Sequence, residues 1–323
     1  NVSNRAHTSR PMKGVPYDGN DPDYAELYHP VPYGDTHRRA PFNAPPEWRE
    51  LWAKRIKDLI DNYQPDHLYF DCAIPFRGED MGATGMDVIA HYYNKSIERH
   101  GKLNSVMCIK ERPWQGLYAD GVTTLDFERG KANDIRKDPW QTDDSMGPWG
   151  YRKGADYMSA DATVDKLIDI VSKNGNMLLN VPIRADGTLD EKTTEILQDI
   201  GQWMALNGEA IYGTRPWYMF GEGHTNEIPH KVIESPDTSG DIRYTTKGDL
   251  LYALILDWPG KGKVVTLEHL APGNSSIGAI ADVSMIGFDG TLEWEHHGDG
   301  LKVTMPAEKP CEFAYALKIS FSD

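Results

Sequence analysis

Apolar residues recur at helical spacing in four segments of the chain. Over residues 46–63 they fall at i, i+3, i+4 and i+7, which is typical of a helix with one buried face. The same spacing predicts helices near 85–100, over 160–173 and over 190–206. Asn174-Gly175 follows the third of these segments and is expected to stop that helix.

Short apolar runs lie between these helices and predict strands. The runs are 67–71, 105–110, 123–127, 140–143 and 177–181. Strands that alternate with helices through short connections indicate βα units around a parallel sheet. Four or five strands are too few for a complete barrel of eight, so the pattern predicts only part of such a barrel.

The pattern changes after about residue 229, where no helical period of useful length remains. Strand-like runs punctuated by Gly, Pro and Asp follow at 250–256, 263–267, 283–286, 301–304 and 313–319. This arrangement is typical of an antiparallel β-sandwich. We therefore expect two domains, a barrel portion over 1–228 and a β-sandwich over 229–323.

Composition excludes several classes of protein. A formal net charge of −15 argues against nucleic acid as a partner, because phosphate backbones need basic surfaces. No apolar run is long enough to span a membrane. Cys72, Cys108 and Cys311 lie far apart, and their odd number leaves at least one free thiol. With no HExxH motif, glycine-rich phosphate loop or Gly-x-Ser-x-Gly elbow, we expect neither a metal nor a cofactor.

Two carboxylates end predicted strands of the parallel sheet, Asp71 after the strand 67–71 and Glu128 after the strand 123–127. Parallel strands present their carboxyl ends at one face, so acids from different strands can converge there. Glycoside hydrolysis needs such a pair, one carboxylate to attack or to activate water and one acid to protonate the leaving oxygen. A separation of about 5–5.5 Å goes with retention and about 6.5–9.5 Å with inversion.

Other acids compete with Glu128 for the role of the acid. Those expected in or near loops on the same face are Asp126, Asp143, Asp144, Glu79 and Glu111. Most residues of this kind are solvated charges, helix caps or salt-bridge partners. The pair Asp71 and Glu128 is therefore weak evidence by itself among 49 acidic residues.

The segment 140–151 combines tryptophans, amides and turn residues. One interpretation is a loop fixed by buried tryptophans, the commoner use of this residue. The other is a sugar platform, because ring faces with hydrogen-bonding edges suit a deoxy sugar with an apolar methyl corner. On the second interpretation Trp140 and Trp149 bind the substrate.

Several stretches together carry a resemblance to a known family. The most specific is 172–182 (Ser-Lys-Asn-Gly-Asn-Met-Leu-Leu-Asn-Val-Pro), which continues through Asp186-Gly187-Thr188 to the block 207–217. Tyr69-Phe70-Asp71, Phe127-Glu128-Arg129-Gly130 and Pro139-Trp140-Gln141-Thr142 follow the same order and rough spacing. In these residues the chain resembles glycoside hydrolase family 29, the retaining α-L-fucosidases, over about 1–225. Many members also carry a β-sandwich after the barrel.

The resemblance implies roles for particular residues. Asp71 would be the nucleophile that forms a covalent fucosyl-enzyme, and Glu128 the general acid/base. Arg112 looks like an arginine that helps to hold the fucose, and Trp149 resembles the aromatic residue near the methyl group on C5 of the sugar. The substrate implied is a fucosylated oligosaccharide or polysaccharide.

The chain departs from the family at its beginning. Family members start with barrel strands that carry a His-Trp motif, a His-His pair and a Trp, and these bind the fucose hydroxyls. None of these precedes Asn1, and the segment 2–7 looks like the end of a strand in the middle of the barrel. We therefore expect a (β/α)8-like barrel whose first strands are absent from this chain, which is either a fragment or is completed by a partner chain.

Alternatives remain open at this point. One is a non-catalytic protein that binds glycans on a degraded hydrolase scaffold, and another is a hydrolase of a related sugar such as galactose. The resemblance implies a secreted, periplasmic or lysosomal type of compartment. No signal peptide is visible, and the chain does not begin with Met.

Overall fold

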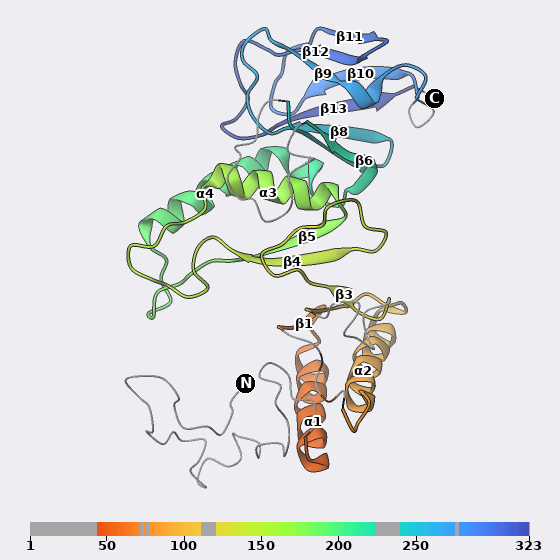
Figure 1. The fold of residues 1–323 in the computed structure, drawn as a ribbon, viewed down its shortest axis with the longest axis vertical. Coiled ribbons are helices and arrows are strands. Elements are labelled where there is room, and N and C mark those ends of the chain that lie inside the picture. Colours follow the sequence, from red (N-terminus) through yellow and green to blue (C-terminus); the bar gives the residue numbers. More distant parts are fainter. Residues whose placement is uncertain are drawn as a thin grey trace. The chain divides into compact units, whose positions relative to one another are not determined.

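The computed structural model describes residues 44–71, 74, 76, 78–110, 121–223, 240–274 and 278–322 (Figure 1). The chain forms two compact units, Asn1–Asp126 and Phe127–Asp323. Three residues that sequence analysis singled out, Cys72, Glu111 and Arg112, lie outside the described residues. No helix in the described ranges is long and apolar enough to cross a membrane.

The first unit contains βα elements with a parallel sheet. Its elements are α1 (Pro46–Tyr63), β1 (His67–Phe70), α2 (Ala83–His100), β2 (Val106–Ile109) and β3 (Thr124–Leu125). The strands pair in the order β1-β2-β3, all parallel. Both helices and the first two strands confirm the predictions, but the strand expected over 123–127 is only two residues long.

The core of this unit lies between the sheet and its two helices. Side chains alternate along a strand, so Leu68 and Phe70 of β1 point to one face together. They pack there with Ile60 of α1 and with residues of α2 such as Val88 and Ile89. The apolar stripes of the helices therefore cover one face of the sheet, and the opposite face carries Tyr69.

The second unit begins with two further βα elements. They are β4 (Trp140–Ser145), α3 (Ala160–Ser172), β5 (Gly175–Asn180) and α4 (Glu191–Asn207), followed by a short 3₁₀ helix (Gly208–Ala210). The two strands pair in parallel, and their register begins with Trp140 opposite Gly175. Ser159 and Asp190 cap the two helices by accepting hydrogen bonds from backbone N–H groups. The predictions for these elements are confirmed, with β4 extended to Ser145.

Trp140 is a core residue of this βα layer. Its side chain is fully buried, its indole N–H donates to the carbonyl of Lys173 over 2.8 Å, and Phe127 meets it edge to face. A Cβ at Gly175 would lie 2.5 Å from the Trp140 ring, so only glycine fits there. The left-handed residue after α3 is Asn174, with φ of 68°. The prediction that Asn174-Gly175 ends the helix is thus correct, but Gly175 serves to make room for Trp140.

The rest of the second unit is an antiparallel β-sandwich. Its strands are β6 (Arg215–Glu222), β7 (Ile242–Lys247), β8 (Leu250–Ile255), β9 (Val264–Leu267), β10 (Ile280–Met285), β11 (Trp294–His297), β12 (Gly300–Thr304) and β13 (Tyr315–Phe321), with a 3₁₀ turn (Glu268–Leu270) after β9. A five-stranded sheet has the order β10-β13-β8-β7-β6, and a three-stranded sheet the order β11-β12-β9. The antiparallel sheet thus takes in β6, which precedes the expected domain boundary at residue 229.

Both faces of the five-stranded sheet are buried. Leu251, Ala253 and Ile255 point toward the three-stranded sheet and form one core with it. Tyr252 and Leu254, which alternate with them, pack instead against α3 and Trp203 of α4. Figure 1 shows these two helices between the β4–β5 pair and the sandwich. This double burial explains the unbroken apolar run at 250–256.

A buried ionic cluster joins α3 to the sandwich. The carboxylate of Asp169 on α3 accepts from Arg243 of β7 at 2.7 Å, from Lys173 at 2.9 Å and from Lys131 at 3.0 Å. The Asp169 side chain is only 3% exposed and that of Arg243 1%. Burial alone would raise the pKa of Asp169, but Arg243, Lys173 and Lys131 together hold it well below its usual range.

The Asp169→Asn variant is expected to lose about 3–5 kcal/mol in free energy of unfolding, because it leaves buried cations without their anion. The exposed Asp199 of α4 provides a control, and Asp199→Asn should change stability by no more than about 0.5 kcal/mol. Since the folded-state pKa of Asp169 is depressed, its stabilisation is full above the unfolded value of about 3.9 and is lost as the pH falls from there. Urea unfolding at pH 7 and at lower pH measures both effects; equal stability of the two variants would contradict the assignment.

Candidate functional site

Asp71 follows directly after β1, and its side chain contacts a lysine and a tyrosine. Its side chain is 78% exposed, and its Oδ1 accepts from Lys110 Nζ at 2.6 Å. The hydroxyl of Tyr69 lies 3.5 Å from the same oxygen. Asp71 thus stands at the carboxyl end of a parallel strand with an ammonium group and a phenol beside it.

Asp126 belongs to the same cluster. It comes directly after β3, its backbone N–H donates to the carbonyl of Ile109, and it is 4% exposed. The hydroxyl of Tyr69 donates to its Oδ2 over 3.2 Å. The first unit therefore gathers Asp71, Tyr69, Lys110 and Asp126 at the ends of its three strands.

Glu128 lies in the second unit, in a turn beside β4. The backbone N–H of Phe127 donates to the carbonyl of Gln141, and that of Arg129 donates to the carbonyl of Asp143. The hydroxyl of Thr142 donates to the carbonyl of Phe127 over 2.6 Å. These bonds fix the backbone on both sides of Glu128, and its side chain is exposed.

Arg129 joins the turn of Glu128 to the loop that carries Trp149. Its backbone is left-handed, with φ of 51°, and its guanidinium donates to the carbonyl of Gly147 over 2.8 Å. The guanidinium carbon also lies 4.6 Å from the centre of the Trp149 ring, within the range of a cation–π contact. Asn180 holds the loop from the other side by donating to the carbonyl of Trp149 over 3.1 Å. Trp149 remains 43% exposed, so its ring is open to the predicted contact with a sugar.

The structure does not support the same role for Trp140. A ring without exposed surface, packed against Phe127 and Gly175, offers no face to a sugar. The hydrophobic core of the second unit accounts for its position. Of the two interpretations of the segment 140–151, the buried tryptophan holds for Trp140, and the role of Trp149 in substrate binding stays a prediction.

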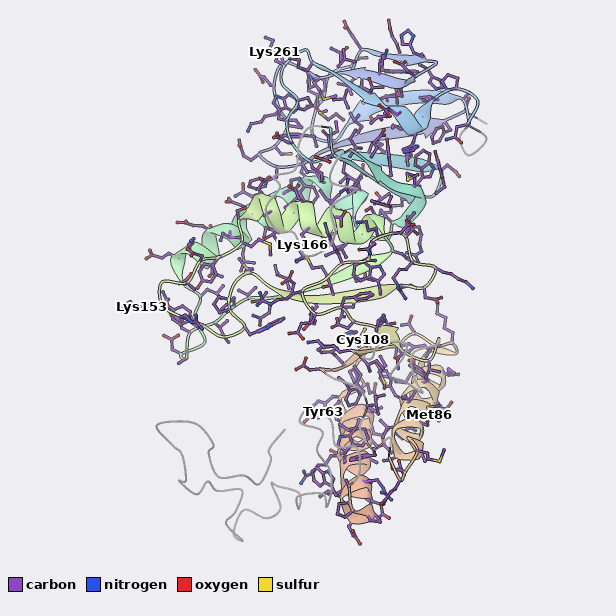
Figure 2. The ribbon with its side chains drawn as sticks, in the orientation of Figure 1. Tyr63, Met86, Cys108, Lys153, Lys166 and Lys261 are labelled. Carbon is purple, nitrogen blue, oxygen red and sulfur yellow. The ribbon has the colours of Figure 1, made fainter. Side chains whose placement is uncertain are left out.

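The acids that compete with Glu128 have different surroundings. Asp144 is 3% exposed and forms an ion pair with Lys166 of α3, which is labelled in Figure 2. Its charge stabilises the contact between β4 and α3. Asp143 is 7% exposed, whereas Glu79 is exposed.

The described side chains around Asp71 and around Glu128 form no group suited to hold a metal. No cluster of three or more His, Cys, Asp or Glu side chains suited to a metal ion occurs in the described ranges. Cys108 is buried and free, with its Sγ 3.2 Å from His67 Nε2. Burial, and after it the charge of Asp126, raises the pKa of this thiol to about 12, so it is a poor ligand and a poor nucleophile at neutral pH.

Sequence analysis missed three residues of these clusters, Tyr69, Lys110 and Arg129. Tyr69 carried a signal, because it lies two residues before Asp71 on the same predicted strand. Lys110 ends the next predicted strand, but only the register of β1 and β2 sets it beside Asp71. Arg129 carried none, because its role depends on a left-handed turn and on a loop twenty residues further along the chain.

Comparison with known proteins agrees with this picture. The family model named alpha-L-fucosidase matches residues 8–209, and the model of the alpha-L-fucosidase C-terminal domain matches residues 235–320. An α-L-fucosidase of Branchiostoma floridae is 33% identical over 91% of this chain and 62% of its own length. The plasma α-L-fucosidase of Pongo abelii is 28% identical over 82% of this chain and 54% of its own length.

Solved structures give the same answer for the fold. The crystal structure of Thermotoga maritima α-fucosidase in complex with fucose is 25% identical, with a TM-score of 0.60, over 85% of this chain and 56% of that chain. The predicted fold class, a (β/α) barrel architecture followed by an antiparallel β-sandwich, is confirmed. The chain spans between 53% and 62% of the length of the first curated relatives it matches. With a family model matched over residues 8–209 and a relative 33% identical, the chain belongs to the α-L-fucosidase family.

Proposed function

We propose that this protein is a retaining exo-glycoside hydrolase that releases α-L-fucose from fucosylated glycans through a covalent glycosyl-enzyme. Its membership of the α-L-fucosidase family supports the substrate class. The single observation that carries the mechanism is Asp71, a carboxylate at the carboxyl end of a parallel strand with Lys110 and Tyr69 beside it. That is where barrel enzymes place their reacting groups.

The reaction has two steps. In the first, an oxygen of Asp71 attacks the anomeric carbon while Glu128 gives a proton to the departing glycosidic oxygen. In the second, Glu128 takes a proton from water, which attacks the same carbon and releases fucose and the Asp71 carboxylate. Each step inverts the anomeric centre, so the product keeps the α configuration.

Two further residues are proposed to bind the sugar. Arg112 would hold fucose hydroxyls, as the resemblance implies. Trp149 would lie against the methyl corner of the sugar, which its exposed ring and its contact with Arg129 support. Arg129 also fixes the turn that carries Glu128. The same arginine would therefore hold both the ring that contacts the sugar and the acid that transfers the proton.

Domain limits and location are proposed on the same basis. We place the barrel portion at 1–228 and the sandwich domain at 229–323, a division that the C-terminal family model over 235–320 supports. A relative with plasma in its name supports a secreted protein, although a periplasmic or lysosomal type of compartment fits equally. A partner chain could add further barrel strands.

Hydrolysis of an aryl α-L-fucoside by the full chain tests the proposal. We expect turnover with release of α-L-fucose, followed by NMR at early times, and no comparable turnover of aryl galactosides. Faster release from a galactoside would point to a different sugar preference. Glycan binding without any turnover would favour a non-catalytic binding protein, and β-L-fucose as first product would contradict retention.

A further inference from the structure

The three parallel strands of the first unit present one polar face. Leu68, Phe70, Met107 and Ile109 turn toward the helices, so the residues that alternate with them turn the other way. The register pairs Tyr69 with Cys108, and Cys108 with Thr124. Moving two residues along each strand gives the next layer on this face, which is Asp71, Lys110 and Asp126. Lys110 thus follows the middle strand, and the two acids follow the strands on either side of it.

Contacts within this layer are specific. Lys110 Nζ lies 2.6 Å from Asp71 Oδ1, and the Lys110 side chain is only 15% exposed, which restricts its freedom. The Tyr69 hydroxyl approaches the same oxygen at 3.5 Å and Asp126 Oδ2 at 3.2 Å. Within the described ranges, both contacts of the Asp71 carboxylate therefore reach Oδ1, and neither reaches Oδ2. Figure 2 labels Cys108, which lies one layer below on β2.

We propose that Lys110 is a positioning residue that holds Oδ1 of Asp71 and so presents Oδ2 to the anomeric carbon. This inference rests on the proposed function and adds to it a residue that acts through the nucleophile. In the first step Oδ2 forms the bond to the anomeric carbon, and the glycosidic oxygen leaves with the proton from Glu128. Oδ1 is then the carbonyl oxygen of the ester, still beside the ammonium group.

The second step gains most from Lys110. As water attacks, the bond between the anomeric carbon and Oδ2 breaks and its electron pair returns to the carboxylate. Lys110 stabilises the negative charge that develops there, as a preorganised donor does in other enzymes. In the first step the same contact stabilises the starting carboxylate, so it assists attack by orientation rather than by charge. Loss of Lys110 should therefore slow release of fucose more than formation of the covalent intermediate.

Steady-state kinetics of the full chain with an aryl α-L-fucoside test this difference. The Lys110→Met variant is expected to show kcat lower by about 100-fold and KM lower in parallel, with kcat/KM changed by less than about tenfold. The glycosyl-enzyme should accumulate, giving a burst of aryl alcohol and an adduct on Asp71 in the intact mass and peptide map. Lys110→Arg, which keeps the charge, should recover part of the rate.

The matched control is Lys102→Met in the bend between α2 and β2, where the lysine is exposed, and it should behave as wild type. If the methionine variant does not fold, Lys110→Gln takes its place with the same expected outcome. Suppose that the wild-type chain turns over and that the Lys110 variants show an unchanged kcat and no adduct. The role of Lys110 would then be overturned, and the proposed function would stand. Absence of turnover in the wild-type chain would overturn the proposed function, and the role of Lys110 with it.

Discussion

The Asp71→Gly variant is expected to hydrolyse aryl α-L-fucosides at least about 10⁴-fold more slowly than the wild-type chain, because it lacks the atom that attacks the anomeric carbon. Fucose binding should change much less, since the carboxylate is one contact among several. The rate of aryl α-L-fucoside hydrolysis by the variant and by the wild-type chain measures the first effect. Calorimetry with fucose measures the second. Asp66→Gly provides the matched control, because this exposed acid lies at the opposite end of the same strand.

Added azide sharpens this test. The glycine variant leaves space for a small anion, which would attack from the side that Asp71 occupied. We expect β-L-fucosyl azide as the product, with part of the lost rate restored. An Asp71 variant with the wild-type rate, or an azide product of the α configuration, would contradict the assignment of the nucleophile.

The second large effect is expected at Glu128. Glu128→Gln should slow the hydrolysis of fucosides with poor leaving groups by about 10²–10⁴-fold, the usual contribution of a general acid or base. Formation of the intermediate from fucosyl fluoride should hardly change, because fluoride leaves without protonation. Rates for a series of leaving groups separate these cases, and Asp138→Asn is the control at another exposed acid in the same unit.

Azide also tests the role of Glu128, because this anion attacks the fucosyl-enzyme without help from a general base. In the Glu128 variant it should intercept the fucosyl-enzyme and yield α-L-fucosyl azide, the opposite anomer to that from the Asp71 variant. A uniform loss for all leaving groups would argue against Glu128 as the acid. The same experiment on Asp126→Asn or Asp143→Asn would then identify which competing carboxylate fills the role.

Helices and buried strands were predictable because each follows from one local pattern. The helical spacing of apolar residues in α1 and α3 and the apolar run of β8 are each visible within a short stretch of the sequence. The strands β6, β7 and β11 were not predicted, since each mixes polar residues with aromatic ones and lacks a clear apolar run. Two of them, β6 and β11, lie at sheet edges. The strand after residue 123 is short because its chain turns at Glu128.

Residues of the candidate site differ in the same way, because some follow from a local pattern in the sequence and others do not. Asp71 and Glu128 could be proposed from their places next to strands and from the family resemblance. Lys110 becomes visible only when the register of β1 and β2 sets it beside Asp71, and a sequence does not state a register. The burial of Trp140 depends on the missing side chain of Gly175, thirty-five residues further along, so its residue type alone suggested a sugar platform.

The ion cluster around Asp169 has a consequence for how the molecule can be divided. The sandwich strand β7 supplies Arg243, and the five-stranded sheet covers the outer faces of α3 and α4. A chain ending before β7 would leave Asp169 without its most buried partner and would expose an apolar helix surface to water. The sandwich therefore cannot be removed without destabilising the rest of the second unit, because it covers the helices of the layer that carries Glu128 and Trp149. We expect the sandwich and this layer to unfold in a single thermal transition.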